Sequence, residues 1–515
     1  MRRDAFASLL LVSATLACDE TSPDPIGEVV VQVDTDLPVP AFVSRLRVDF
    51  YTESGRWYET RDVSLADPRV WPTSFGVFVD DAAESIALVR LRAYPEGGVR
   101  DYRGERFAER PKMPLDDALA LVDPSRPSNG TPRLVDKTGK DITPRFEPQP
   151  LLTVDRLIRV RVRAGERLTA HVVLRGACVG TMADVVGKRT CVDREDALVE
   201  PVVAPLDDDR APRPSLAGSF APSEKCTKTP RSGTTLPDGT RLFDEQACVD
   251  GAMFRLGAHD GVFGHLEDLP ERVAILDPFL IERYEVTVAR YRKALADGFV
   301  SPDATPTVND ADLAKDEADF QQTGLCSWST TPRGREMLAL TCISHEAAIA
   351  LCRFFGGDLP SEAQWEYAAT IAGRPFRTRF AWGGPDDTIP GCERAIWGRG
   401  ATNFTGQVCN TTFGFGPAPV NAAEKEGGDV TPGLAIVNLG AGVAEWARDT
   451  MAPLDAACWL ASGLRDPGCF GVPGQKSVRG GGWRDNVASL IAANRRREDE
   501  WSTGIGFRCV YRGTR

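Results

Sequence analysis

The chain has 515 residues, of which 42% are hydrophobic and 26% charged, and its formal net charge is −12. This length exceeds what one hydrophobic core supports, so at least two domains are expected. The composition is that of a folded soluble protein. Nucleic acid is not expected as a partner, because a phosphate-binding surface needs a basic excess or a basic face. The basic run Arg495 to Arg497 is followed by three acidic residues and predicts a salt-bridged segment.

Residues 1–18 have the features of a lipoprotein signal peptide. Two arginines precede the apolar run Ala5 to Val12, which is too short to span a bilayer and has the length of a signal-peptide core. The tetrapeptide that ends in Cys18 (TLAC) resembles a bacterial lipobox, and residues 19–26 form a polar tether. We therefore expect lipidation of Cys18 and a lipid-anchored protein of the bacterial cell envelope, periplasmic or surface-exposed. The alternative is secretion without a lipid.

Residues 27–200 predict an all-β domain. Apolar and polar residues alternate with a period of two in the segments Val29 to Val33, Leu46 to Phe50, Val89 to Ala93, Ile158 to Val162 and Leu168 to Leu174. The last two segments flank a short turn and predict a hairpin. One face of each strand is expected to be buried and the other wet. Antiparallel strands without intervening helices favour a β-sandwich, of immunoglobulin-like or transthyretin-like type.

Residues 201–245 predict a linker between two domains. They are rich in Pro, Asp, Ser, Thr and Gly and show no apolar period. The second domain is then expected to span residues 246–515.

The chain has 13 cysteines, and twelve remain if Cys18 is lipidated. An even number suits an exported protein with disulfides. Ten of the twelve fall in sequence-near pairs: Cys178 with Cys191, Cys226 with Cys248, Cys326 with Cys342, Cys392 with Cys409, and Cys458 with Cys469. Zinc is the competing interpretation, but no Cys-x-x-Cys occurs and no two of the four histidines have ligand spacing. Spacing alone does not determine the connectivity.

Two successive helices are predicted in the second domain. Ser344 can cap the first helix, whose apolar residues recur at helical spacing, and Gly356-Gly357 supplies a left-handed stop. Ser361 and Gln364 then form a capping box for the second helix.

Five blocks of the second half carry a family resemblance. They are Phe279 to Thr287, the helical segment Ala347 to Ala369, NLGAGVAEW (Asn438 to Trp446), RGGGW (Arg479 to Trp483) and GFRC (Gly506 to Cys509). Together they resemble the formylglycine-generating enzyme family, also called the sulfatase-modifying factor family. The resemblance implies an irregular, lectin-like α/β (α+β) fold with little regular secondary structure. It also implies a disulfide between Cys352 and Cys509.

The resemblance makes a prediction about copper. Family members with oxidase activity use copper and dioxygen to convert a sulfatase cysteine into formylglycine, and they hold the metal with two cysteines shortly after the RGG(S/G)W block. Here these positions are Asp485 and Leu490, and Gly482 replaces the usual serine of the block. Copper(I) requires soft thiolates. Copper is therefore not expected as a cofactor, and no catalytic residue is assigned.

Calcium is the possible cofactor that the resemblance leaves open. In the first calcium site Gly442 replaces an asparagine of the family and Glu445 retains the carboxylate, while Asn403 corresponds to an asparagine of the second site. For Glu445 the alternative is a buried carboxylate paired with an arginine such as Arg448 or Arg508.

Two functions from different classes remain. The first is a non-catalytic binding or structural lipoprotein of the envelope, with a groove for a protein, peptide or glycan ligand. The candidate groove residues are Trp483, Arg484, Asp485, Asn486 and Asn494, and the alternative for Trp483 is plain core packing. The second is a formylglycine-generating-type oxidase or another protein-modifying enzyme. A further branch of the fold, the iron-dependent sulfoxide synthases, needs a histidine triad from a helical domain, which the β-rich N-terminal half does not offer.

Overall fold

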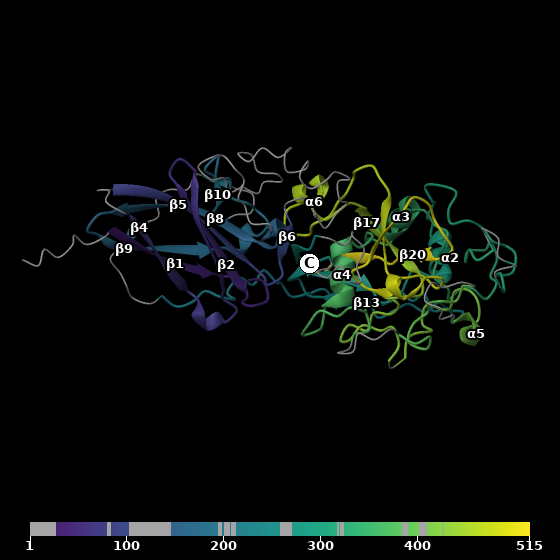
Figure 1. Cartoon of the computed structure of the whole chain (residues 1–515). Coiled ribbons are helices and arrows are strands. Elements are labelled where there is room, and N and C mark those ends of the chain that lie inside the picture. The colour runs from purple at the N-terminus through teal and green to yellow at the C-terminus, as the bar shows by residue number, and fades with distance from the viewer. Residues whose placement is uncertain are drawn as a thin grey trace, which may run out of the picture.

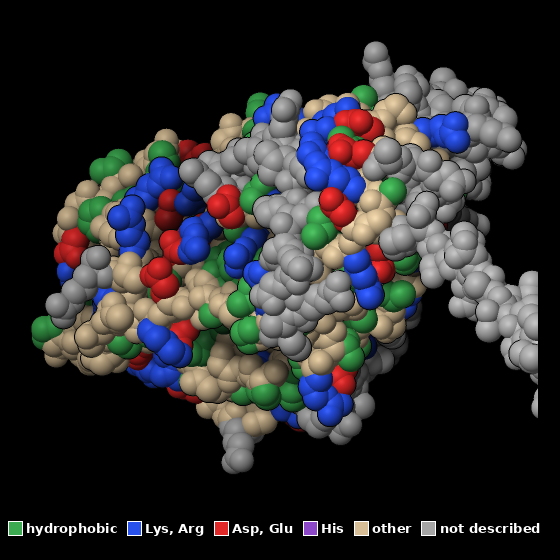
Figure 2. All heavy atoms as spheres, turned by 90° about the vertical axis from the view of Figure 1, so that its left-hand side faces the viewer, with side chains coloured by type: hydrophobic (Ala, Val, Ile, Leu, Met, Phe, Trp, Pro, Cys, Tyr) green, Lys and Arg blue, Asp and Glu red, His purple; other side chains and the backbone are tan. Residues whose placement is uncertain are grey.

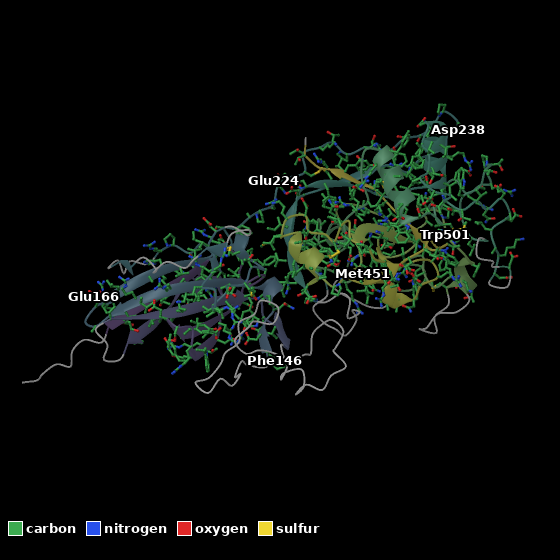
Figure 3. The ribbon with its side chains drawn as sticks, turned by 90° about the horizontal axis from the view of Figure 1, so that it is seen from above. Phe146, Glu166, Glu224, Asp238, Met451 and Trp501 are labelled. Carbon is green, nitrogen blue, oxygen red and sulfur yellow. A yellow bond between two sulfur atoms is a disulfide. The ribbon has the colours of Figure 1, made fainter. Side chains whose placement is uncertain are left out.

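The computed structural model describes residues 27–79, 84–101, 146–193, 198–199, 206–207, 213–257, 270–316, 319, 324–383, 390–400, 409–425 and 427–514. The expected signal peptide with Cys18, the tether and Asn403 lie outside the described residues. Two lobes lie end to end (Figure 1), and we call them the N-terminal lobe (residues 27–207) and the C-terminal lobe (residues 213–514). Seen from above (Figure 3), Glu166 lies at the far end of the N-terminal lobe and Trp501 lies in the C-terminal lobe.

The N-terminal lobe contains two four-stranded sheets, with strand orders β12-β9-β1-β4 and β3-β2-β5-β8. Their strands are β1 (Gly27–Thr35), β2 (Arg45–Thr52), β3 (Trp57–Ser64), β4 (Thr73–Val79), β5 (Glu84–Tyr94), β8 (Val154–Arg163), β9 (Arg167–Leu174) and β12 (Leu206–Asp207). Short elements connect them: η1 (Pro68–Val70), β6 (Val99–Asp101), β7 (Phe146–Pro148), η2 (Pro150–Leu152), η3 (Gly176–Cys178), β10 (Thr190–Cys191) and β11 (Leu198–Val199). All ladders are antiparallel except β1 with β9, which is parallel.

The apolar faces of the two sheets meet in one buried core. Val29, Val31 and Val33 of β1 are at most 1% exposed, and the alternate residues Val48 and Phe50 of β2 pack in the same cluster. Full burial of such side chains contributes about 1.5–3 kcal/mol each. The five segments with a period of two are all strands, as the sequence predicts.

The predicted hairpin is wrong. β8 pairs with β5 in one sheet, whereas β9 pairs with β1 and β12 in the other, so the turn between β8 and β9 crosses from sheet to sheet. Alternation in the sequence indicates which face of a strand is buried but not which strand lies beside it. With the two strands in opposite sheets, both apolar faces reach the same core.

The expectation of a wet outer face is also wrong for the middle of the second sheet. Arg47, Asp49, Arg90 and Arg92 lie on its outer face, and each is at most 2% exposed. They form ion pairs with one another and with Glu147 and Asp155. Residues of the loop from 179 to 190 and of β7 cover this face, and tertiary cover of this kind leaves no mark in strand periodicity.

Toward the edges the charged side chains do reach solvent. Figure 2 shows Lys and Arg side chains beside Asp and Glu side chains over the end of the N-terminal lobe. Ion pairs with exposed partners in this lobe include Arg159 with Glu53, Arg163 with Glu84, and Arg167 with Glu28. Exposed pairs of this kind contribute about 0–1 kcal/mol each, so they balance charge more than they stabilise.

The C-terminal lobe combines short sheets with few helices. Its sheets have the orders β13-β16-β21, β14-β15 and β19-β18-β17-β20. The strands are β13 (Gln246–Val249), β14 (Ala252–Leu256), β15 (Arg272–Leu276), β16 (Phe279–Glu282), β17 (Ala444–Thr450), β18 (Lys476–Arg479), β19 (Arg495–Glu498), β20 (Ile505–Gly506) and β21 (Val510–Arg512). The helices are α2 (Val288–Ala296), α3 (His345–Phe354), α4 (Glu362–Thr370), α5 (Asn410–Phe413), α6 (Ala457–Ala461) and the 3-10 helix η5 (Val487–Leu490). This is an α+β lobe.

The two predicted helices are confirmed as α3 and α4. The Ser344 hydroxyl accepts the N–H of Ala347 at 3.0 Å and so caps α3, and Gly356 after its end has φ +84°. Ser361 and Gln364 form both hydrogen bonds of the capping box of α4. Local side-chain chemistry fixes these ends, so the sequence alone was sufficient to locate them.

The described residues contain six disulfides, which join the predicted pairs: Cys178–Cys191, Cys226–Cys248, Cys326–Cys342, Cys352–Cys509, Cys392–Cys409 and Cys458–Cys469. Five of them close short loops. Cys352–Cys509 spans 157 residues and ties α3 to the segment just before β21.

The lobes share one apolar junction. Val273 and Ile275 of β15 and Leu464 of the loop between α6 and β18 belong to the same buried cluster as the core of the N-terminal lobe. The described part of the predicted linker packs along both lobes: the N–H of Gly218 donates to Leu37 O at 2.9 Å, and that of Thr227 to Gly513 O at 3.1 Å. None of the helices within the described ranges is long and apolar enough to cross a membrane.

Candidate functional site

Asp485 and Leu490 stand at the two positions where the family places its copper-binding cysteines, so neither position carries a thiolate. The Asp485 carboxylate accepts the N–H of Gly482 at 2.7 Å and pairs with Arg496 at 2.5 Å. Leu490 ends η5 and is fully buried among apolar and aromatic side chains. A carboxylate that an arginine already neutralises and an aliphatic side chain do not fit copper(I), which binds soft sulfur ligands.

The local backbone explains why position 482 is a glycine. A Cβ atom at this position would lie 2.9 Å from the carbonyl oxygen of Gly504, closer than a side chain normally approaches backbone. The serine that is usual in the family would therefore require the segment at Gly504 to shift. The serine hydroxyl of the family is therefore absent at a position where the backbone at Gly482 lies close to the backbone at Gly504.

The five predicted groove residues differ in exposure: Trp483 and Asn494 are buried, and Arg484, Asp485 and Asn486 are partly exposed. Trp483 is 0% exposed, its indole N–H donates to Thr503 O at 3.2 Å, and its ring meets Phe415 edge-on at 5.5 Å. Trp483 is therefore packed in the core, which is the alternative that the sequence left open for it. The guanidinium of Arg484 lies over the Trp483 ring, with its carbon 5.6 Å from the centroid.

The two asparagines of the set serve the local backbone. The Asn486 side chain accepts the N–H of Ala488 at 2.9 Å and caps η5, and the Asn494 amide donates to Ala488 O at 3.1 Å. The structure thus places Arg484, Asp485 and Asn486 on one loop. The side chains of Asp485 and Asn486 accept backbone N–H groups of that loop.

Glu445 of β17 is a buried carboxylate paired with an arginine. Both of its oxygens accept from Arg508, at distances between 2.6 and 2.9 Å, and Oε2 also accepts the indole N–H of Trp365 at 2.9 Å. Arg448, the other arginine considered, contacts Asp358 instead at 3.6 Å. A guanidinium occupies the place where a cation would bind, so the residues present at Glu445 do not fit calcium.

Glu285, which sequence reasoning did not single out, lies beside the modified calcium motif. Its Oε2 accepts from the Asn438 amide at 3.3 Å, and a Cβ added to Gly442 would come within 3.0 Å of its Oε1. Glu285 therefore fills the space next to the position where the family has an asparagine. Burial raises the pKa of Glu285 to about 8, so the carboxyl group is largely protonated at neutral pH.

A second buried charge cluster joins α4 to two strands of the lobe. Glu362 pairs with Arg495 and Arg479, and Glu366 pairs with Arg479 at 2.6 Å. Two residues of the basic run are thus salt-bridged as predicted, but their partners lie outside the adjacent acidic residues: Glu362 for Arg495 and Asp485 for Arg496.

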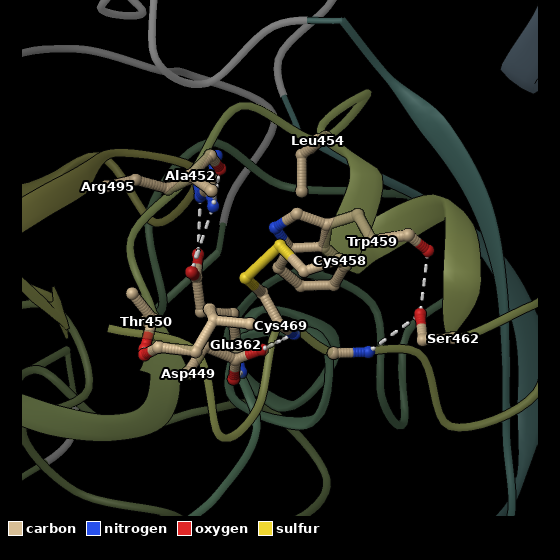
Figure 4. The surroundings of a disulfide bond; sticks show 12 residues. Glu362, Asp449, Thr450, Ala452, Leu454, Cys458, Trp459, Ser462, Cys469 and Arg495 are labelled. Atoms are coloured by element: carbon tan, nitrogen blue, oxygen red, sulfur yellow. Dashed lines mark hydrogen bonds and ion pairs between the residues drawn. A yellow bond between two sulfur atoms is a disulfide. The ribbon is translucent and has the colours of Figure 1, made fainter. Parts of the chain in front are cut away.

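Asp449 links this charge cluster to the Cys458–Cys469 disulfide. Its two oxygens accept the N–H groups of Glu362 and Cys469, each at 2.8 Å (Figure 4). Burial raises the pKa of Asp449 to about 7, and the nearby Glu362 carboxylate adds to the shift. No period or motif in the sequence marks this residue, because its neighbours come from three separate segments.

The fold and these positions define a disulfide-braced α+β domain of the formylglycine-generating enzyme type in which the copper positions carry no sulfur. The model of the family described as sulfatase-modifying factor enzyme 1-like domain matches residues 227–512, and the chain belongs to this family. The match begins inside the predicted linker.

Two curated relatives are named formylglycine-generating enzyme. The one from Streptomyces coelicolor is 31% identical over 191 residues, which are 34% of this chain and 54% of the relative. The one from Thermomonospora curvata is 28% identical over 224 residues, or 39% of this chain and 70% of the relative. The chain thus spans about half the length of the first relative. Among solved structures, PvdO from Pseudomonas aeruginosa matches 55% of this chain and 99% of its own, with 17% identity and a TM-score of 0.37.

Proposed function

We propose that this protein is a lipid-anchored protein of the bacterial envelope whose family domain serves binding or structure and does not catalyse oxidation. In this proposal the domain keeps the irregular, lectin-like arrangement that the resemblance implies, and its ligand is a protein, a peptide or a glycan. The lipid on Cys18 is its contact with the membrane.

One observation carries the non-catalytic part of the proposal. All twelve cysteines after Cys18 are held in disulfides, and the two copper positions are Asp485 and Leu490. An oxidase of this type needs two thiolates on one copper ion. In the oxidising envelope these disulfides persist, so no thiolate pair is available.

The test is a direct assay for the oxidase. The purified chain is incubated with copper, a reductant, oxygen and a peptide with the sulfatase-type Cys-x-Pro-x-Arg sequence, and aldehyde formation is measured together with copper(I) titration. The formylglycine-generating enzyme of Streptomyces coelicolor serves as the positive control. We expect no aldehyde and no tight copper(I) binding. Aldehyde that disappears on Cys458→Ser or Cys469→Ser would establish the alternative, a modifying enzyme with rearranged chemistry.

A further inference from the structure

A cleft of about 700 Å³ opens where the α3–α4 connection, β21 and the loop that carries Asp466 meet. Its charged lining residues are Lys228, Asp277, Asp358, Arg448, Asp466 and Arg512. None of the five predicted groove residues lines this cleft, and neither does Leu490. Ligand sites in proteins typically have volumes of about 300–1,000 Å³, so this cleft has the size of a binding site.

The acidic groups of the cleft already have partners in the protein. Asp358 pairs with Arg353 at 3.4 Å and with Arg448 at 3.6 Å, Asp277 pairs with Arg465 at 2.5 Å, and Asp466 accepts the N–H of Asp277 at 3.0 Å. Arginines therefore balance the charges of Asp358 and Asp277, whereas Asp466 is held by a backbone N–H.

Two cations of the cleft, Lys228 and Arg512, are not engaged in ion pairs among the described residues, and a third, Arg448, is shared with Asp358. Both Lys228 and Arg512 are exposed. Arg448 is held in place by stacking on Phe470, with its guanidinium carbon 3.8 Å from the ring centroid, and its contact to Asp358 is long. A stacked guanidinium presents its edge to a carboxylate in fixed geometry. The cleft thus favours a ligand with several negative charges.

One wall of the cleft is the edge strand β21, whose outer side is open at Arg512. Glu282 donates to Cys509 O and Gly513 donates to Pro278 O, which fixes the alternation of the antiparallel β16–β21 ladder. The N–H and C=O groups of Val510 and Arg512 therefore point away from β16. Those of Val510 pair with Asp358, at 2.9 Å in each direction. The equivalent groups of Arg512 remain at the open edge, where an extended main chain can pair with them.

We propose that this cleft binds an extended acidic peptide segment of a partner protein. The peptide main chain pairs with the N–H and C=O of Arg512, and its carboxylates meet Lys228, Arg448 and the Arg512 side chain. An acidic glycan offers the same carboxylates but not an alternating row of N–H and C=O groups, so the open edge favours a peptide. This site is separate from the copper positions, and its test does not depend on whether the domain is an enzyme.

The test uses fluorescein-labelled hexaglutamate and the whole chain, with fluorescence anisotropy as the readout. We expect binding at about 50 mM salt that weakens at about 200 mM, as for ligands held by exposed charges, and no binding of labelled hexalysine. The double variant Lys228→Gln/Arg512→Gln should bind at least about tenfold more weakly, a change of about 1.4 kcal/mol. The matched control is Lys225→Gln, which neutralises an exposed lysine three residues from Lys228 and outside the cleft lining, and it should leave the affinity unchanged.

Two further probes separate the main chain from the charges. Hexaglutamate that is N-methylated at alternate residues keeps its carboxylates but loses N–H donors, and it should bind more weakly than the parent peptide. Absence of hexaglutamate binding at low salt, or equal affinity of the double variant and the wild type, would overturn the proposal. Tighter binding of oligogalacturonate than of hexaglutamate would overturn the assignment to a peptide and identify an acidic glycan.

Discussion

At the scale of single residues, two buried acids of the family domain, Glu445 and Glu285, differ in their partners. Both oxygens of Glu445 accept from Arg508, whereas Glu285 is buried next to Asn438 and forms no salt bridge with another residue that the structure describes. The two acids therefore differ in their surroundings: Glu445 forms an ion pair, whereas burial raises the pKa of Glu285 to about 8. Arg508 of the GFRC block is distant in sequence from both acids: it pairs directly with Glu445, and its charge opposes the larger effect of burial on the pKa of Glu285.

Replacing Arg508 by methionine should destabilise the protein by about 3–5 kcal/mol, because it leaves the Glu445 carboxylate buried and unpaired. Urea denaturation measures the change in the free energy of unfolding. The double variant Arg508→Met/Glu445→Gln should recover part of this loss, since no buried charge remains. If instead calcium raises the unfolding temperature of the wild type and Arg508→Met costs little, Glu445 is a calcium ligand.

The raised pKa values predict a pH dependence of stability. Glu285 has a folded pKa of about 8 against an ordinary value of 4.5, and burial raises the pKa of Asp429 to about 7. Between the ordinary and the folded values the native state holds more protons than the unfolded state, so stability falls as pH rises through this window. We expect the free energy of unfolding to decrease from about pH 5 to about pH 8.

The variant Glu285→Gln tests this assignment, because it keeps the shape of the side chain and cannot ionise. Its free energy of unfolding should decline less steeply over the same pH range, as measured by urea denaturation at a series of pH values. An identical slope in wild type and variant would show that Glu285 does not titrate in this window.

At the scale of elements, disulfides and caps take the place of a large regular core in the C-terminal lobe. The strands there have two to seven residues, and most helices are short. Short elements bury little apolar surface each, so covalent links between them matter more. Cys352–Cys509 is the link with the longest span, and it holds α3 against the end of the chain.

Loss of the two kinds of disulfide should differ in cost. In the chain-entropy model, removal of Cys352–Cys509 through alanine costs about 5 kcal/mol, and removal of Cys458–Cys469, which closes a short loop, costs about 3 kcal/mol. Denaturation of the two double alanine variants measures both values against the wild type. Equal losses would mean that strain or residual structure, and not loop length, determines the effect.

At the scale of the whole molecule, the two lobes are joined by a small apolar junction with one buried cation at its side. The Arg272 guanidinium donates to the carbonyl oxygens of Trp459 and Gly463 at 2.8 and 2.7 Å, and burial lowers its pKa to about 10. These bonds hold the loop that is closed by Cys458–Cys469, and Leu464 of this loop reaches the N-terminal core. The disulfide loop is thus a structural part of the junction.

The variant Leu464→Asp should separate the unfolding of the two lobes, because it places a charge in the apolar junction at a cost of several kcal/mol. Differential scanning calorimetry should show two transitions in the variant, with the wild type as reference. Leu460→Asp is the control, since Leu460 lies in the same loop and is 53% exposed. A calorimetric trace like that of the wild type would show that the junction does not couple the lobes.

The predicted anchor concerns the mature protein as a whole. In a bacterial host, we expect the amino terminus to begin at a lipidated Cys18, and mass spectrometry of the membrane fraction should detect the lipid mass. Cys18→Ala should release the protein from the membrane fraction. An intact amino terminus, or cleavage at another position, would contradict the lipoprotein assignment.

The sequence by itself determined what depends on neighbours along the chain: the strand segments and the caps of α3 and α4. Its motifs also carried the family resemblance, and its spacing suggested the short-range cysteine pairs, whose connectivity the structure then established. Tertiary structure decided what depends on distant residues. Periodicity of β8 and β9 could not reveal that they lie in opposite sheets, and the polar side chains of Arg90 and Arg92 could not reveal that they are buried. The roles of Trp483 and Glu445 likewise rest on Thr503 and Arg508, because burial and ion pairing are properties of space and not of sequence order.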